Sequence, residues 1–156
     1  MRTARLAGHS EVRIEEVPNP VVESGFVIVK TVVSAICGSE MHGYRGEGSV
    51  SGNSGHEAAG IVHAIGEGVE SLQIGDRVAA SAVVGCGNCD YCLKGQYTWC
   101  PQFKVYTNMH AEYFTIPARG CNKLPDDMPW NIGVLLGGES GKVLIDYGVA
   151  DLSGSV

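Results

Sequence analysis

The sequence predicts a mainly β protein built from short strands and tight turns. Its 156 residues include 22 glycines and 6 prolines, a high proportion of turn-forming residues. Valine and isoleucine are frequent, and runs with the periodicity of a helix are few, which favours strands. A chain of this length is typical of one domain and can bury a core without requiring disulfides or a metal.

The charge balance argues against nucleic acid and anionic membranes as partners. The 11 basic and 17 acidic side chains give a net charge of -6, and the basic residues are scattered along the chain. No stretch approaches the length of a membrane span, and no apolar segment of the secretory type follows Arg2 and Arg5. We therefore expect a soluble, cytoplasmic protein.

The first strands are expected at apolar or alternating segments that end at proline or glycine. Residues 11–17 alternate like a half-exposed strand. Residues 26–36 form a nearly unbroken apolar, β-branched run, which predicts a buried strand ending directly before Cys37. The glycine-rich residues 38–60 are expected to include a long loop, and such loops often carry function.

The second half of the chain is expected to continue in the same way. We expect further strands over residues 58–65, 78–84, 111–117 and 142–147. The first two of these are joined through glycine turns, which favours antiparallel neighbours. Residues 150–156 are expected to be a frayed tail.

One helical segment is expected after residue 124. Asp126 or Asp127 would cap it, with Pro129 in its first turn, and the apolar residues 130–136 would form its body.

Four cysteines lie within a 15-residue span. Cys86, Cys89, Cys92 and Cys100 are separated by two, two and seven residues, so four thiolates can converge on one tetrahedral zinc ion. Two disulfides and an iron–sulfur cluster are the alternatives. The close spacing favours metal over disulfides, and the last gap is longer than is usual for a cluster. We therefore predict a structural zinc lobe over residues 86–100.

A second group of potential ligands lies on glycine-rich segments at strand ends. The segments read Cys37-Gly-Ser-Glu-Met-His42 and Gly55-His-Glu-Ala-Ala-Gly60. One cysteine, one histidine and one carboxylate with an open fourth position describe a catalytic zinc site. Taken singly, Cys37 is better explained as a small buried residue and His56 as an ordinary histidine.

Together, these two motifs and the cysteine lobe resemble the zinc-containing medium-chain alcohol dehydrogenases. The order of the motifs matches over residues 1–138, and Gly75-Asp-Arg-Val78 and Ala111-Glu-Tyr113 are also similar to that family. The resemblance implies a GroES-like β-barrel catalytic domain with few short helices, here over residues 1–149. It also implies two zinc sites and a small alcohol or polyol as substrate, with zinc acting as a Lewis acid on the alcohol oxygen.

The resemblance assigns the ligands of the catalytic zinc. Cys37 and His56 would bind the ion, and Glu57 beside them would be a ligand in some states. The family places a third protein ligand near the end of the segment that residues 135–138 resemble. Glu139 would fill that role or else be part of a linker.

The resemblance also assigns three residues around the zinc. Ser39 and His42 match the positions that relay the substrate proton to solvent. Glu40 stands where the family usually has an aspartate, and it would orient His56 from behind.

The sequence does not predict a nicotinamide-binding domain. Family members carry a Rossmann domain with a Gly-x-Gly-x-x-Gly turn, whereas Gly66-Glu-Gly68 has Ser71 in place of the third glycine. Gly138-Glu-Ser-Gly-Lys142 lacks the full phosphate-loop pattern, so we interpret both segments as plain turns. We hypothesise that residues 138–141 are a splice in place of the cofactor domain. NAD(P) is then expected only for a full-length parent.

Two functions of different classes remain open. The first is the zinc-binding catalytic domain of an NAD(P)-dependent alcohol or polyol dehydrogenase, unable to transfer hydride alone. The alternative is a redox-inactive zinc-binding scaffold, with weak hydratase or esterase activity if its open zinc activates water. Because members of the resembled family usually oligomerise through the domain that is missing here, we expect a monomer or a non-native dimer. Cys121 matches no role and is expected to be a free, partly buried thiol.

Overall fold

Strands dominate the computed structural model of the chain, which describes residues 1–46, 55–137 and 143–146. Three expectations, Glu139 as a ligand, the splice and the tail, lie outside these residues. The strands are β1 (Arg2–Gly8), β2 (Glu11–Glu16), β3 (Phe26–Ile36), β4 (Ala58–Ile65), β5 (Arg77–Ala80), β6 (Val83–Val84), β7 (Lys104–Val105), β8 (Tyr113–Pro117), β9 (Cys121–Lys123) and β10 (Val143–Asp146). The helices are α1 (Gly38–Arg45), α2 (Asp90–Leu93) and α3 (Trp130–Gly133), with short 3₁₀ turns η1 (Tyr97–Trp99), η2 (Ala118–Gly120) and η3 (Val134–Gly137).

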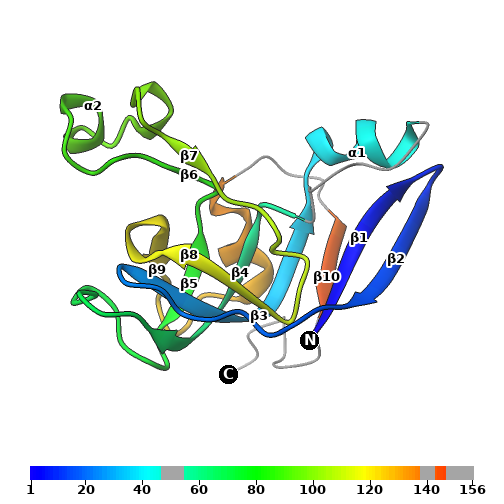
Figure 1. Cartoon of the computed structure of the whole chain (residues 1–156), viewed down its shortest axis with the longest axis horizontal. Coiled ribbons are helices and arrows are strands. Elements are labelled where there is room, and N and C mark those ends of the chain that lie inside the picture. The colour runs from blue at the N-terminus through cyan, green and yellow to red at the C-terminus, as the bar shows by residue number, and fades with distance from the viewer. Residues whose placement is uncertain (47–54, 138–142, 147–156) are drawn as a thin grey trace.

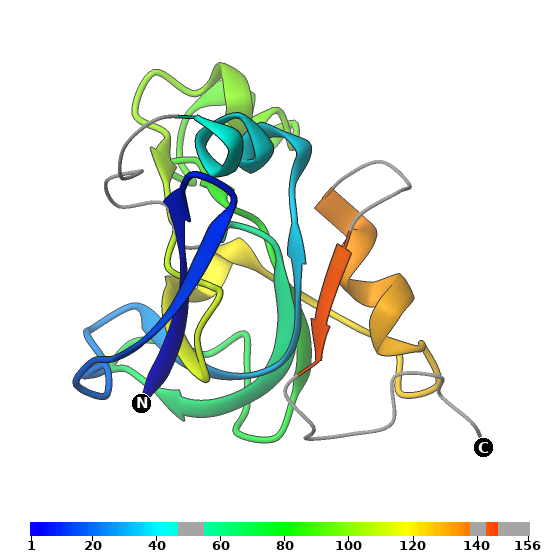
Figure 2. The same cartoon turned by 90° about the vertical axis from the view of Figure 1, so that its right-hand side faces the viewer.

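Strand β3 organises the main sheet, as its apolar sequence predicts. The strand order is β10-β3-β4-β5-β9, and β8 also pairs with β3, so that the sheet has six strands (Figures 1 and 2). All of these pairings are antiparallel. The first half of β3 pairs with β8 and its last four residues pair with β10. Strand β3 is buried on both faces, since the consecutive residues Val32 and Val33 point to opposite faces and both are completely buried.

The described strands curve strongly, but their pairing does not close into a barrel. Strands β10 and β9 end the sheet on its two sides, within the residues that the structure covers. The hairpin of β1 and β2 stands beside this sheet (Figure 2). A bridge between Thr3 and Ala111 ties the hairpin to the segment before β8. The expected mainly β fold with few short helices is therefore confirmed.

Strand β1 is an element that sequence reasoning missed. Its two arginines interrupt the apolar pattern by which a strand is predicted. In the structure both lie at the surface and form ion pairs. Arg2 pairs with Glu112, and Arg5 pairs with Glu15 on the neighbouring β2. The intervening side chains of Thr3 and Ala4 are buried.

The strand expected over residues 78–84 is split in two. Strand β5 stays in the main sheet, and the chain then leaves it at Ser81, whose hydroxyl donates to the carbonyl of Val83. Strand β6 pairs instead with β7 and forms the base of the cysteine lobe, which projects away from the sheet (Figure 1). The split therefore allows one chain segment to serve both the core and the lobe.

Two expectations about helices were wrong. The expected loop over residues 38–60 begins with helix α1, which Glu40 stabilises by accepting a hydrogen bond from the N–H of Cys37 at the helix start. Neither Asp126 nor Asp127 caps α3, which begins after Pro129 with no side-chain cap. The carbonyl of Asp126 instead accepts from the guanidinium of Arg77, which lies over the ring of Trp130.

In the part of the chain that the structure covers, the helices are all too short or too polar to cross a membrane.

Candidate metal centres

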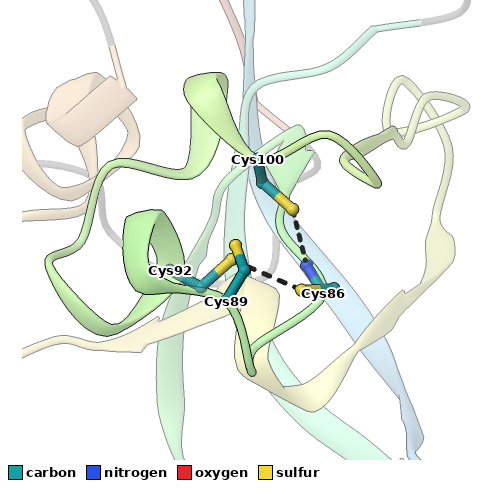
Figure 3. Close-up of side chains that lie close together, drawn as sticks. All are labelled: Cys86, Cys89, Cys92 and Cys100. Carbon is teal, nitrogen blue, oxygen red and sulfur yellow. Dashed lines mark hydrogen bonds between the residues drawn. The ribbon is translucent and has the colours of Figure 1, made fainter.

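The four cysteines of the lobe converge on one point (Figure 3). Their sulfur atoms all lie within 4.8 Å of one another, and Cys92 and Cys100 are buried. The sulfur atoms of Cys86 and Cys92 are 3.9 Å apart, far longer than a disulfide bond. All six cysteines of the chain are free, so the alternative of two disulfides is excluded in this structure.

Short-range geometry builds the lobe. Helix α2 begins directly after Cys89 and brings Cys92 round by one turn to face Cys86. Gly85 leaves room for this approach, since a Cβ atom at that position would lie 2.4 Å from the sulfur of Cys92. The β6–β7 pair then closes the base.

Backbone N–H groups donate to the sulfur atoms of Cys100 and Cys86. The N–H of Cys86 donates to the sulfur of Cys100, at 3.3 Å, and the N–H of Asn88 donates to the sulfur of Cys86, at 3.5 Å. The N–H groups of Asn88 and Cys89 lower the pKa of Cys86 to about 6, while burial raises the pKa of Cys92 to about 11. Four sulfur donors, two of which accept hydrogen bonds from backbone N–H groups, can fill the four positions of a tetrahedral zinc ion. The lobe therefore fits a structural zinc site.

A second centre forms where β3 ends and β4 begins. The ligand atoms of Cys37, His56 and Glu57 all lie within 4.8 Å of one another. Glu57 is buried, and the other two residues are half-buried. Strands β3 and β4 are antiparallel, with Ser34 opposite Ala58, so the chain after one strand and the chain before the other reach the same edge of the sheet.

The donor set of this centre fits a catalytic metal. It combines one thiolate, one imidazole and one carboxylate, which leaves coordination positions for a substrate or water. The three residues lie close together, as the sequence predicts. Their role as metal ligands stays a prediction.

Helix α1 places two further predicted residues at different depths. The hydroxyl of Ser39 lies 3.5 Å from Nε2 of His56, at the edge of the centre. His42 lies one turn further along α1 and is exposed to solvent. Their proposed part in a proton relay stays a prediction.

Glu40 is the most deeply buried acidic side chain near the centre. Its Oε2 accepts from the N–H of Cys37 at 2.9 Å and lies 4.0 Å from Nδ1 of His56. Its Oε1 accepts from the N–H of Gly55 at 3.1 Å. Burial raises the pKa of Glu40, but the hydrogen bonds from His110 and Cys37 outweigh it, so the pKa lies below its ordinary value. The distance to His56 is long for a hydrogen bond, and the predicted orienting role remains a prediction.

His110 was missed by sequence reasoning. It is completely buried, and its Nε2 lies 3.2 Å from Oε1 of Glu40. Its Nδ1 lies 2.9 Å from the hydroxyl of Ser34. A single histidine without ligand spacing carries no signal in the sequence, because its partners are 70 and 76 residues away along the chain.

Gly55 provides the tightest backbone position of the centre. Its φ angle is +86°, and a Cβ atom there would lie 2.5 Å from Nδ1 of His110. We expect Gly55→Ala to lower the free energy of unfolding by about 1–3 kcal/mol, because it adds backbone strain and displaces the buried imidazole. Chemical denaturation measures the change, and Gly68→Ala, also at positive φ but in open space, is the control. Equal losses in the two variants would show that the ring contact adds nothing.

Cys121 is a free thiol that is partly buried, as expected. Burial raises its pKa to about 12 and keeps it neutral and unreactive.

Comparisons with known proteins find relatives that cover most of this chain. Residues 23–126 match the family model described as alcohol dehydrogenase GroES-like domain. The starvation-sensing protein RspB of Escherichia coli K12 is 37% identical over 129 residues, which cover 78% of this chain and 37% of that protein. A sorbitol dehydrogenase of Bombyx mori is 34% identical over 142 residues, which cover 83% of this chain and 40% of that protein.

Solved structures show the same fold. The alcohol dehydrogenase TADH from Thermus sp. ATN1 superposes with a TM-score of 0.75 at 32% identity, covering 88% of this chain and 44% of that one. Galactitol-1-phosphate dehydrogenase from Escherichia coli gives a TM-score of 0.74 at 30% identity, covering 86% and 41%. The match to the curated relatives thus spans well under half of their length.

Proposed function

Since this chain belongs to the alcohol dehydrogenase GroES-like domain family of zinc-type medium-chain dehydrogenases, we propose that it is the zinc-binding catalytic part of an NAD(P)-dependent alcohol or polyol dehydrogenase. One observation carries the proposal. Cys37, His56 and Glu57 bring three different ligand types within 4.8 Å of one another, at the edge where Ser39 also lies.

Each residue of the centre has a proposed task. Cys37, His56 and Glu57 would hold the metal, and a zinc ion bound there would supply Lewis acidity to the oxygen of an alcohol. Ser39 accepts the proton of the substrate hydroxyl, because a hydroxyl group both accepts and donates. His42, one helical turn away and exposed, receives that proton and passes it to solvent.

The names of the relatives support a proposal for the substrate class. Proteins similar to this chain are named sorbitol dehydrogenase and D-xylulose reductase, and one similar structure is described as complexed with NADH. We propose an alcohol or polyol as the substrate and a nicotinamide as the acceptor. Because the sequence contains no Gly-x-Gly-x-x-Gly turn between a strand and a helix, the proposal assigns nicotinamide binding to a separate unit.

Cobalt substitution tests the proposal without requiring turnover. The absorbance of the Co²⁺-loaded chain is measured with and without sorbitol, and again for Cys37→Ser. We expect the polyol to change that part of the spectrum which depends on Cys37, because an alcohol oxygen enters an open position.

A spectrum that does not respond to sorbitol or to simple alcohols would contradict the proposal. If the Cys37→Ser spectrum also equalled that of the unmodified chain, only the cysteine lobe would bind metal. The chain would then act as a zinc-binding scaffold.

A further inference from the structure

We propose that His110 is a positioning residue of the Cys37–His56–Glu57 centre, and that it acts through Glu40. This inference rests on the proposed function, since it assumes that the centre binds a metal. His110 is not a catalytic residue, because its side chain is completely buried and no substrate can reach it.

Glu40 connects the two chain segments that carry the ligands. One carboxylate oxygen accepts from the N–H of Cys37, which is a ligand of the centre. The other accepts from the N–H of Gly55, which directly precedes His56 and Glu57. The position of this one carboxylate therefore sets the distance between the thiolate and the other two ligands.

His110 holds the carboxylate of Glu40 in place. A carboxylate with two backbone N–H donors is ionised and can only accept, so Nε2 of His110 must carry the proton of the 3.2 Å contact. The hydroxyl of Ser34 lies 2.9 Å from Nδ1 and can donate to it while the Nε2–H group donates to Glu40. The chain Ser34–His110–Glu40 is thus fully hydrogen-bonded inside the protein.

The surroundings leave His110 no freedom to move. Its carbonyl accepts from the N–H of Ala4 at 2.7 Å and from the hydroxyl of Thr3 at 3.0 Å, both on β1. The preceding N–H, of Met109, donates to the carbonyl of Gly55 at 3.2 Å. The imidazole lies directly against Gly55, where no side chain would fit. His110 is therefore anchored to β1, β3 and the ligand segment at once.

Loss of the Nε2 donor would leave Oε1 of Glu40 with one donor, the N–H of Gly55, in place of two. The carboxylate would then turn or draw in water, because a buried anion that loses a hydrogen bond is destabilised. Either change would shift Cys37 relative to His56, and groups that orient metal ligands are worth about 10- to 100-fold in metal affinity.

Two substitutions separate this role from simple packing. In His110→Gln the side-chain amide nitrogen reaches about as far as Nε2 and can still donate to Glu40. In His110→Asn the amide reaches only as far as Nδ1, so it can contact Ser34 but not Glu40. Both replace an imidazole by a neutral amide, and they differ in which partner is kept.

The test titrates Co²⁺ into the full chain and into both variants. Absorbance lost in Cys37→Ser reports the centre, and absorbance lost in Cys92→Ser reports the lobe. We expect His110→Asn to weaken Co²⁺ binding at the centre by about 10-fold or more. His110→Gln should retain affinity close to that of the unmodified chain, and the lobe should be unchanged in both.

Equal losses for the two variants, a loss that extends to the lobe, or no loss in His110→Asn would overturn the inference. If the asparagine variant does not fold, His110→Phe keeps a ring at this position and removes the Nε2 donor, and unchanged affinity at the centre would overturn the inference equally. Absence of Cys37-dependent Co²⁺ binding in the unmodified chain would instead overturn the proposed function, and the inference with it.

Discussion

Cys37→Ser is expected to reduce the zinc content of the chain from two ions to one. Cys37 supplies the only thiolate of its centre, and a neutral serine hydroxyl is a poor zinc ligand. Because groups that only support a ligand are worth about 10- to 100-fold in affinity, loss of the ligand itself should exceed about 100-fold. Native mass spectrometry counts the remaining ions.

Cys121→Ser is the matched control for this experiment. It also removes one partly buried thiol, but it lies outside both groups of ligands, so two ions should remain. The assignment of the centre would fail if Cys37→Ser kept both ions or if Cys121→Ser lost one.

Cys92→Ser is expected to unfold the cysteine lobe while the main sheet stays folded. Apart from its four cysteines, the described part of the lobe is held by the two-residue pairing of β6 with β7 and by two single-turn helices, and Leu93 and Trp99 are largely exposed. Zinc at 1,000 times its dissociation constant contributes about 4 kcal/mol to the state that binds it. That contribution should be lost from this region.

Hydrogen exchange followed by mass spectrometry measures the effect. Protection should fall in peptides from residues 85–103 and persist in peptides from β3 and β4. Cys37→Ser leaves all four lobe cysteines in place. In this variant, protection should fall around α1 and persist in peptides from residues 85–103. Uniform loss of protection across the chain would mean that the lobe and the sheet unfold together.

Elements with a local signal could be predicted. The nearly unbroken apolar run of β3 predicts both ends of the strand correctly, because a strand that is covered on two faces lacks a regular alternation of polar and apolar residues. The lobe was recognised for a similar reason, since spacing of two residues brings cysteines together through turns within a few residues.

Elements that depend on neighbours were missed or misplaced. Strand β1 carries two arginines that only its ion pairs with Glu112 and Glu15 explain. Helix α1 is short and contains two glycines, which weakens its signal in the sequence. Glu40 stabilises the start of the helix by accepting from the N–H of Cys37, and its side chain is buried by tertiary contacts. The aspartates before α3 offered a cap that the structure does not use.

The lobe and the types of donor atom proposed for both centres could be predicted from short stretches of the chain, because ligand type and close spacing are local properties. The groups that support the second centre could be identified only from the folded chain. The antiparallel register of β3 and β4 places Cys37 close to His56. The buried polar groups of Glu40, His110 and Ser34 are then paired by hydrogen bonds to one another, because buried polar groups need partners. Such pairing follows from desolvation in the folded core, so no short stretch of sequence encodes it.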